Sequence, residues 1–185
     1  MVVSFPELLV SLVSSNPHEA FQKIEELRKQ NLGLFLLEMA KQLVAHDMPT
    51  NQRQMAALII KNSVIGQSQQ ATDALSKQWL AIPFQQRDMI KQILLQGLSL
   101  PNNDARSTAA QVVGQIGVIE LRNNEWNDLI SIMITACKGD SYILKEGTLN
   151  ALGILCEDIP DGIIQKQSSE ILDAIVSGIN PSSPP

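Results

Sequence analysis

The chain has 185 residues, of which 44% are hydrophobic, 4% aromatic and 18% charged, and its 19 acids against 14 bases give a formal net charge of −5. This length and aliphatic content suit one folded domain with a sizeable core and exclude a disordered chain. The acidic balance argues against a module that works by neutralising phosphates, so no nucleic-acid partner is expected. The two cysteines are too few for a disulfide scaffold or a four-thiolate zinc site.

The sequence predicts neither a membrane span nor a secretory leader. No uninterrupted run of about 18 apolar residues occurs, so we expect no membrane insertion. The first residues lack a basic segment, and Pro6 and Glu7 interrupt their apolar stretch, which is unlike a signal peptide. Together with the sparse cysteines, this favours a protein of the cytosol or nucleus.

Apolar residues recur at helical spacing along nearly the whole chain, as in the stripe of Leu32, Leu36, Met39 and Leu43. No segment alternates with period two between tight hairpin turns, so a sheet is not expected. The sequence therefore predicts an all-α fold. The expected helices lie at about residues 4–14, 17–30, 32–46, 52–65, 72–81, 84–99, 104–120, 125–138, 142–158 and 168–179.

Pairs of these helices repeat. Similar helical segments place Gly114 and Gly153 39 residues apart, and a second similarity places Leu129 and Ile171 42 residues apart. A weaker match at a spacing of 53 fits an insertion around Trp79. Helix pairs at roughly 40 residues are typical of HEAT or armadillo repeats. We therefore predict an α-α superhelix, a HEAT-repeat solenoid of about four and a half helical hairpins.

Gly114 and Gly153 fall inside predicted helices, where glycine costs about 1 kcal/mol relative to alanine. One interpretation is that the missing Cβ atoms let paired helices approach closely, and it predicts that Gly153→Leu lowers stability. The alternative is that both glycines are tolerated without a packing role.

The last predicted helix has no partner to complete its hairpin. We therefore expect residues 1–180 to be an N-terminal solenoid fragment of a longer chain, and residues 181–185 to be a disordered tail.

Nothing in the sequence predicts an enzyme. Its two histidines, His18 and His46, are distant from Cys137 and Cys156, which lie in apolar helical stripes and are expected to be buried rather than reactive. The acids near Glu157 lack the spacing of a calcium loop, and no glycine-rich phosphate loop occurs. We expect no catalytic residue, no metal and no cofactor, and favour a binding scaffold.

Several stretches, in order along the chain, resemble the N-terminal HEAT repeats of the importin-β (karyopherin-β) family. They include Ile-Lys-Asn at residues 60–62, Trp-Leu at 79–80 and Asn-x-Trp-x-x-Leu-Ile at 124–130. Residues 148–159 and 170–178 resemble the helices that follow. Transportins share some of these elements, but the surroundings of Trp79 and Cys156 favour importin-β.

The resemblance implies a nuclear transport receptor that acts in nuclear protein import. Such a receptor binds Ran GTPase in its GTP form and Phe-Gly nucleoporins, and it moves between cytoplasm and nucleus through the nuclear pore. In the family, importin-α and cargo bind to repeats that this chain does not contain. The alternative is a generic HEAT scaffold or adaptor for another complex, such as a phosphatase.

The resemblance also implies binding residues. The family places Ran on inner helices, so Lys61 is the first candidate, as a cation facing an acidic GTPase surface; Arg53 and Lys23 are weaker candidates. Each could instead be an ordinary solvated side chain. Phe-Gly segments bind between outer helices, where Leu172 and Val176 match pocket positions. These two could instead be core residues.

Overall fold

The computed structural model of the chain describes residues 4–14, 17–159, 162, 165 and 168–178, so the predicted tail at 181–185 lies outside the described residues. All regular elements in the described part are α-helices, which confirms the all-α prediction. The helices are α1 (Phe5–Leu12), α2 (His18–Gln30), α3 (Leu32–Val44), α4 (Thr50–Val64), α5 (Gln69–Leu80), α6 (Phe84–Gly97), α7 (Asn103–Arg122), α8 (Leu129–Lys138), α9 (Tyr142–Asp158) and α11 (Ser168–Gly178).

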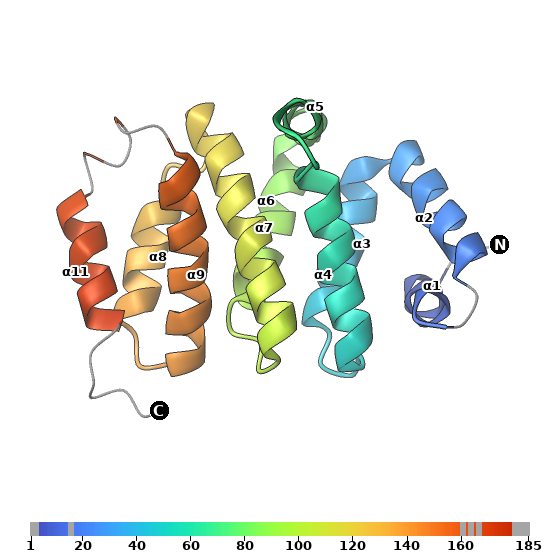
Figure 1. Cartoon of the computed structure of the whole chain (residues 1–185), viewed down its shortest axis with the longest axis horizontal. Coiled ribbons are helices and arrows are strands. Elements are labelled where there is room, and N and C mark those ends of the chain that lie inside the picture. Colours follow the sequence, from blue (N-terminus) through green and yellow to red (C-terminus); the bar gives the residue numbers. More distant parts are fainter. Residues whose placement is uncertain (1–3, 15–16, 160–161, 163–164, 166–167, 179–185) are drawn as a thin grey trace.

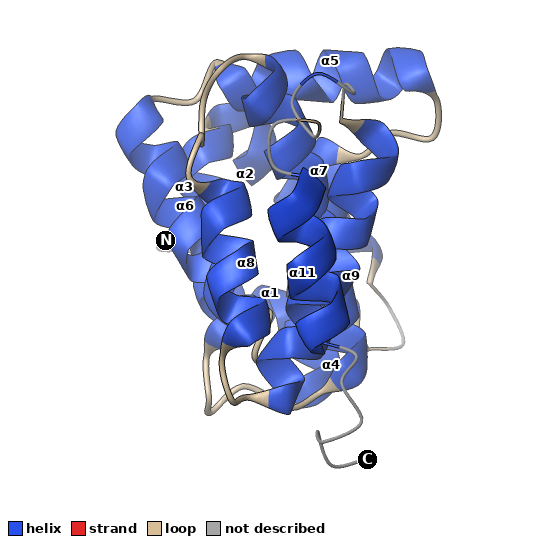
Figure 2. Cartoon of the chain, turned by 90° about the vertical axis from the view of Figure 1, so that its left-hand side faces the viewer, coloured by secondary structure: helices blue, strands red, loops and turns tan. Residues whose placement is uncertain are grey.

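The helices stand side by side along the long axis of the molecule in two layers (Figures 1 and 2). One layer, which we call the inner layer, consists of α4, α7 and α9, and each of these packs against the next. The outer layer consists of α3, α6, α8 and α11. The hairpins α3/α4, α6/α7 and α8/α9 each connect the two layers. This stack of antiparallel hairpins confirms the predicted HEAT-repeat solenoid.

Helix α5 is additional to the hairpins. It lies across one end of the layers between α4 and α6 (Figure 2), where the sequence predicted an insertion around Trp79. Its one buried residue is Trp79, while Ser68 caps its first turn by accepting a hydrogen bond from the Ala71 amide. Trp79, with the partly buried Leu80 beside it, therefore anchors this helix on the core of the stack.

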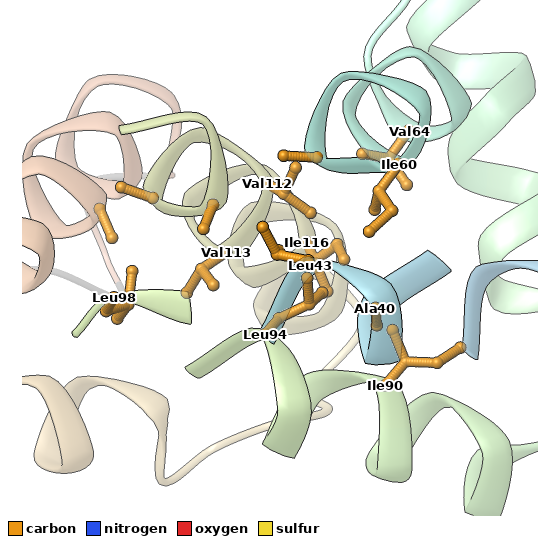
Figure 3. Close-up of a cluster of buried hydrophobic side chains, with 14 of the residues drawn as sticks. Ala40, Leu43, Ile60, Val64, Ile90, Leu94, Leu98, Val112, Val113 and Ile116 are labelled. Atoms are coloured by element: carbon orange, nitrogen blue, oxygen red, sulfur yellow. The ribbon is translucent and has the colours of Figure 1, made fainter. Parts of the chain in front are cut away.

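The core runs continuously between the two layers and is almost entirely aliphatic. Figure 3 shows side chains of α3, α4, α6 and α7 meeting there, among them Leu43, Ile60, Leu94 and Ile116, all of which are fully buried. Burying one such side chain contributes about 1.5–3 kcal/mol before the entropy of ordering it is subtracted. None of the helices in the described part is long and apolar enough to cross a bilayer.

Helix α8 begins at Leu129, four residues later than the sequence predicted. Helix α7 ends in a Schellman motif, in which the Glu125 amide donates to the Glu120 carbonyl and the Asn124 amide donates to the Leu121 carbonyl. Asn124 has φ 58° and Trp126 has φ 50°, which is incompatible with a continuing right-handed helix. The prediction of a helix from residue 125 was wrong because this turn leaves helical geometry twice.

The two repeat-related glycines differ in environment. A Cβ atom on Gly114 would lie 2.9 Å from Cβ of Ile154, so α7 approaches α9 closely there. The close approach is confirmed, but it joins the inner helices of neighbouring hairpins, whereas the sequence predicted it between the two helices of one pair. Gly153 is exposed, and a Cβ atom on it would meet nothing within 4 Å. The close-packing prediction for Gly153 was wrong, because no further inner-layer helix of the described chain packs against that side of α9.

Candidate binding surfaces

Lys61 lies near the end of α4 in the inner layer and is half-buried. Within the described part it forms no ion pair or side-chain hydrogen bond. The repeat spacing of 53 aligns it with Gly114, the position on α7 that faces the next inner helix. The ammonium group of Lys61 therefore has no acidic partner within the described part of the chain. It belongs to the inner layer, where the resemblance implies that Ran binds.

Arg53, also on α4, is partly committed to the fold. Its Nε donates to the carbonyl oxygen of Met48 at 3.0 Å, which holds the turn between α3 and α4. Arg106, 53 residues later, does the same on α7 through Nη1 and the carbonyl oxygen of Leu100 at 2.7 Å. The repeat spacing could have revealed this structural use of Arg53, because it aligns the two arginines.

Lys23 lies on α2, which packs against α1 and α3. These contacts do not assign α2 to either layer, so the inner-helix placement of Lys23 stays a prediction. Its Nζ donates to Oε2 of Glu26, one turn away, at 2.8 Å, and 40% of its side chain is exposed. Within the part of the chain that the structure describes, Lys23 contacts neither Arg53 nor Lys61, so the structure does not assemble the three cations into one site.

Leu172 and Val176 are 62% and 71% exposed on α11, at one end of the stack (Figure 1). The buried face of this helix is formed by Ile171 and Ala174. The interpretation of Leu172 and Val176 as core residues is therefore wrong. They form an exposed apolar pair on an outer-layer helix, one turn apart.

The strongest polar feature of the described chain was missed in the sequence. Glu120 of α7 is completely buried and accepts three hydrogen bonds. The donors are Trp79 Nε1 at 3.0 Å, Arg87 Nη1 at 2.7 Å and Lys91 Nζ at 2.6 Å. A buried carboxylate is tolerated only when it is paired in this way. The sequence did contain one sign of this buried carboxylate, because Glu120 is the only charged residue in the apolar run at residues 116–121.

The two cations reach further, onto the turn between α7 and α8. Arg87 also forms an ion pair with Glu125, and Lys91 Nζ lies 4.9 Å from the centre of the Trp126 ring, a cation–π contact. Burial alone would lower the pKa of Arg87, but the hydrogen bonds and charges of Glu125 and Glu120 raise it, so the guanidinium stays charged. The hydrogen bond from Arg87 in turn lowers the pKa of Glu125, against the opposing effect of burial.

The lowered pKa of Glu125 predicts a pH dependence. Below the ordinary value of 4.5 the unfolded chain binds a proton that the folded chain does not, so stability falls as the pH drops through this range. Because Glu125 is 35% exposed, we expect a contribution of about 1 kcal/mol or less. Urea unfolding of wild type and Glu125→Gln from neutral pH to about pH 3 should show their difference disappearing at the acid end. A difference that persists there would contradict the assignment.

The cysteines offer no reactive centre. Cys137 is fully buried and Cys156 is half-buried, and burial raises the pKa of both thiols, which disfavours the nucleophilic thiolate. Among the residues that the structure describes, no cluster of histidine, cysteine, aspartate and glutamate could hold a metal ion.

Comparison with known proteins supports one family. No protein-family model matches the chain. Importin subunit beta-1 of Arabidopsis thaliana is 33% identical over 184 residues, which cover 97% of this chain and 21% of that protein. The same subunit of Schizosaccharomyces pombe is 25% identical over 89% of this chain. The chain thus spans about a fifth of the length of the relatives it matches.

Solved structures agree with the sequence relatives. A crystal structure of importin beta superimposes on 98% of this chain and 22% of its own, with a TM-score of 0.89 and 26% identity. Yeast importin-beta (Kap95p) superimposes on 96% of this chain and 22% of its own, with a TM-score of 0.87 and 25% identity. These matches confirm the resemblance found in the sequence, and the chain is an importin-β-like HEAT-repeat segment of the karyopherin-β family.

Proposed function

We propose that this chain is the part of a nuclear transport receptor that binds Ran GTPase in its GTP form, and that it also contacts Phe-Gly nucleoporins during nuclear protein import. The observation that carries the proposal is the match of nearly the whole chain to importin beta in both sequence and fold. Structures with the same fold include a Kap95 complex with Nup1 and Kap95p bound to RanGDP. The receptor would work in the cytoplasm, the nucleus and the nuclear pore.

Binding, rather than chemistry, is the proposed activity of this segment. The inner layer provides Lys61 as an uncompensated cation, with Arg53 beside the turn at the start of α4. An acidic partner surface would neutralise Lys61 without displacing an existing ion pair. Lys23 is the weaker candidate, because the partner would have to replace Glu26.

Charge reversal of Lys61 tests the Ran proposal. We expect Lys61→Glu to weaken binding of Ran·GTP roughly tenfold, a change of about 1.4 kcal/mol. The measurement is a fluorescence titration with Ran·GTP, with Ran·GDP as the comparison ligand. Lys41→Glu is the matched control, because Lys41 is an exposed lysine of the outer layer. Equal affinities for the two lysine variants would remove Lys61 from the interface.

The exposed pair on α11 tests the nucleoporin proposal. Leu172→Ser combined with Val176→Ser removes the apolar surface without disturbing the buried Ile171 and Ala174. We expect severalfold weaker retention of the variant on an immobilised Phe-Gly peptide, since each apolar side chain contributes roughly 1 kcal/mol when a partner covers it. Unchanged retention would move the nucleoporin contact elsewhere.

The competing function is a HEAT scaffold for another complex, such as a phosphatase. It differs from the proposal in one measurable respect, which is nucleotide dependence. A transport receptor distinguishes Ran·GTP from Ran·GDP, and a phosphatase scaffold binds neither. Failure to bind Ran in either state, together with capture of phosphatase subunits, would favour the scaffold.

A further inference from the structure

The two layers are not equally continuous. In the inner layer α4 packs against α7, and α7 against α9. In the outer layer α3 packs against α6 and α8 packs against α11, but the backbones of α6 and α8 make few close approaches within the described structure. The joint between the hairpins α6/α7 and α8/α9 is therefore closed on its inner side and lacks close helix packing on its outer side.

Two side-chain contacts bridge the outer side of this joint. The Arg87–Glu125 ion pair and the stacking of Lys91 on Trp126 both connect α6 with the turn that leads into α8. The cations of both contacts are fixed from behind by the buried carboxylate of Glu120. On the α6 side of the bridge, the two cations are held by the buried Glu120. On the other side, their partners Glu125 and Trp126 belong to a turn.

The turn bears the geometry of a segment held in place. Trp126 has φ 50°, a conformation that a bulky residue avoids unless its surroundings impose it. Trp126 as a whole is 9% exposed, and Lys91 lies over the face of its ring. The contacts to α6 therefore offset the unfavourable backbone conformation of Trp126. Without these contacts, we expect the turn to move toward a more favourable backbone conformation.

We propose that Arg87, Lys91, Glu125 and Trp126 form a clasp that sets the angle between the α6/α7 and α8/α9 hairpins. When the clasp is closed, its two contacts connect α6 to the turn before α8, where the outer helices themselves do not pack closely. When it is released, α8 moves away from α6 while the α7–α9 packing acts as the hinge. The clasp makes this joint the point at which the curvature of the solenoid is controlled.

Variants on the turn side test the clasp without exposing the buried carboxylate. Glu125→Gln removes the ion pair, and Trp126→Asn removes the ring while keeping a residue that tolerates positive φ. Glu120 keeps all three of its donors in the double variant. Glu38→Gln is the control, because it weakens an exposed ion pair to Lys41 on α3, outside the joint. Should the double variant fail to fold by circular dichroism, Glu125→Gln alone replaces it.

Pulsed EPR between spin labels measures the joint directly. Labels at the exposed residues Gln92 of α6 and Ser131 of α8 span the clasp, in a background of Cys137→Ala and Cys156→Ser. Labels at Lys41 and Gln92 span the α3–α6 joint, where the helices pack directly. We expect the clasp variant to lengthen and broaden the Gln92–Ser131 distance distribution and to leave the Lys41–Gln92 distribution unchanged. The Glu38→Gln control, measured with the Gln92–Ser131 labels so that Lys41 is intact, should leave that distribution unchanged. An unchanged Gln92–Ser131 distribution, or equal broadening at both joints, would overturn the proposal.

Discussion

Replacing Glu120 with alanine is expected to destabilise the fold by about 3–5 kcal/mol, the usual cost of removing one partner from a buried ion pair. The variant leaves Lys91 buried without its carboxylate and deprives Arg87 of one of its two acidic partners. It also leaves the buried indole N–H of Trp79, the one fully buried residue of α5, without an acceptor. Urea unfolding followed by circular dichroism measures the loss.

The matched comparison is Glu38→Ala. It breaks the surface ion pair between Glu38 and Lys41, which has the same length as the buried pair between Glu120 and Lys91. Lys41 Nζ lies 2.6 Å from Oε1 of Glu38, and the two side chains are 51% and 34% exposed. We expect a change of about 0–1 kcal/mol there, because solvent screens exposed pairs. If Glu120→Ala and Glu38→Ala cost the same, burial does not govern the energetics of the Glu120 cluster.

Local signals predicted most of the fold. The stripe of α3 follows directly from the spacing of Leu32, Leu36 and Met39, and the helix starts where Asn31 accepts a hydrogen bond from the Leu34 amide. Helix α9 starts where Ser141 does the same for Leu144. Information within one turn of the chain determines such boundaries, so the sequence is sufficient to place them.

The binding surfaces were less predictable, because they depend on which faces the stack covers. Leu172 and Val176 have the same spacing of four residues as Ile171 and the partly buried Ile175, so the sequence offers two equivalent apolar stripes. Only the packing of Ile171 shows which stripe is exposed. The partners of Glu120 are 29 to 41 residues away along the chain, so no local pattern identifies them. The late start of α8 has the same origin, since contacts from α6 to Glu125 and Trp126 hold its preceding turn.

Gly147→Ala is expected to be the most damaging of the conservative glycine substitutions. Gly147 is buried in α9, where a Cβ atom would overlap the carbonyl oxygen of Leu98 and lie 3.0 Å from its carbonyl carbon. It would also lie 3.1 Å from Cγ of Arg106, whose guanidinium holds the turn before α7 and pairs with Glu146 at 2.6 Å. Backbone cannot rotate away as a side chain can, so α9 must shift. We expect a loss near the upper end of the about 1–3 kcal/mol typical of overpacking, measured by urea unfolding.

Gly153→Ala in the same helix is the control, and its effect should have the opposite sign. Its Cβ atom meets nothing within 4 Å, so the substitution adds no clash. Alanine restricts the unfolded chain more than glycine does and is favoured in a helix by about 1 kcal/mol. The two variants make the same chemical change six residues apart, so their difference isolates the contact between α9 and the turn at Leu98. If Gly147→Ala also stabilised the fold, the close approach of α9 to that turn would be absent in solution, and with it the packing of the α8/α9 hairpin against the one before it.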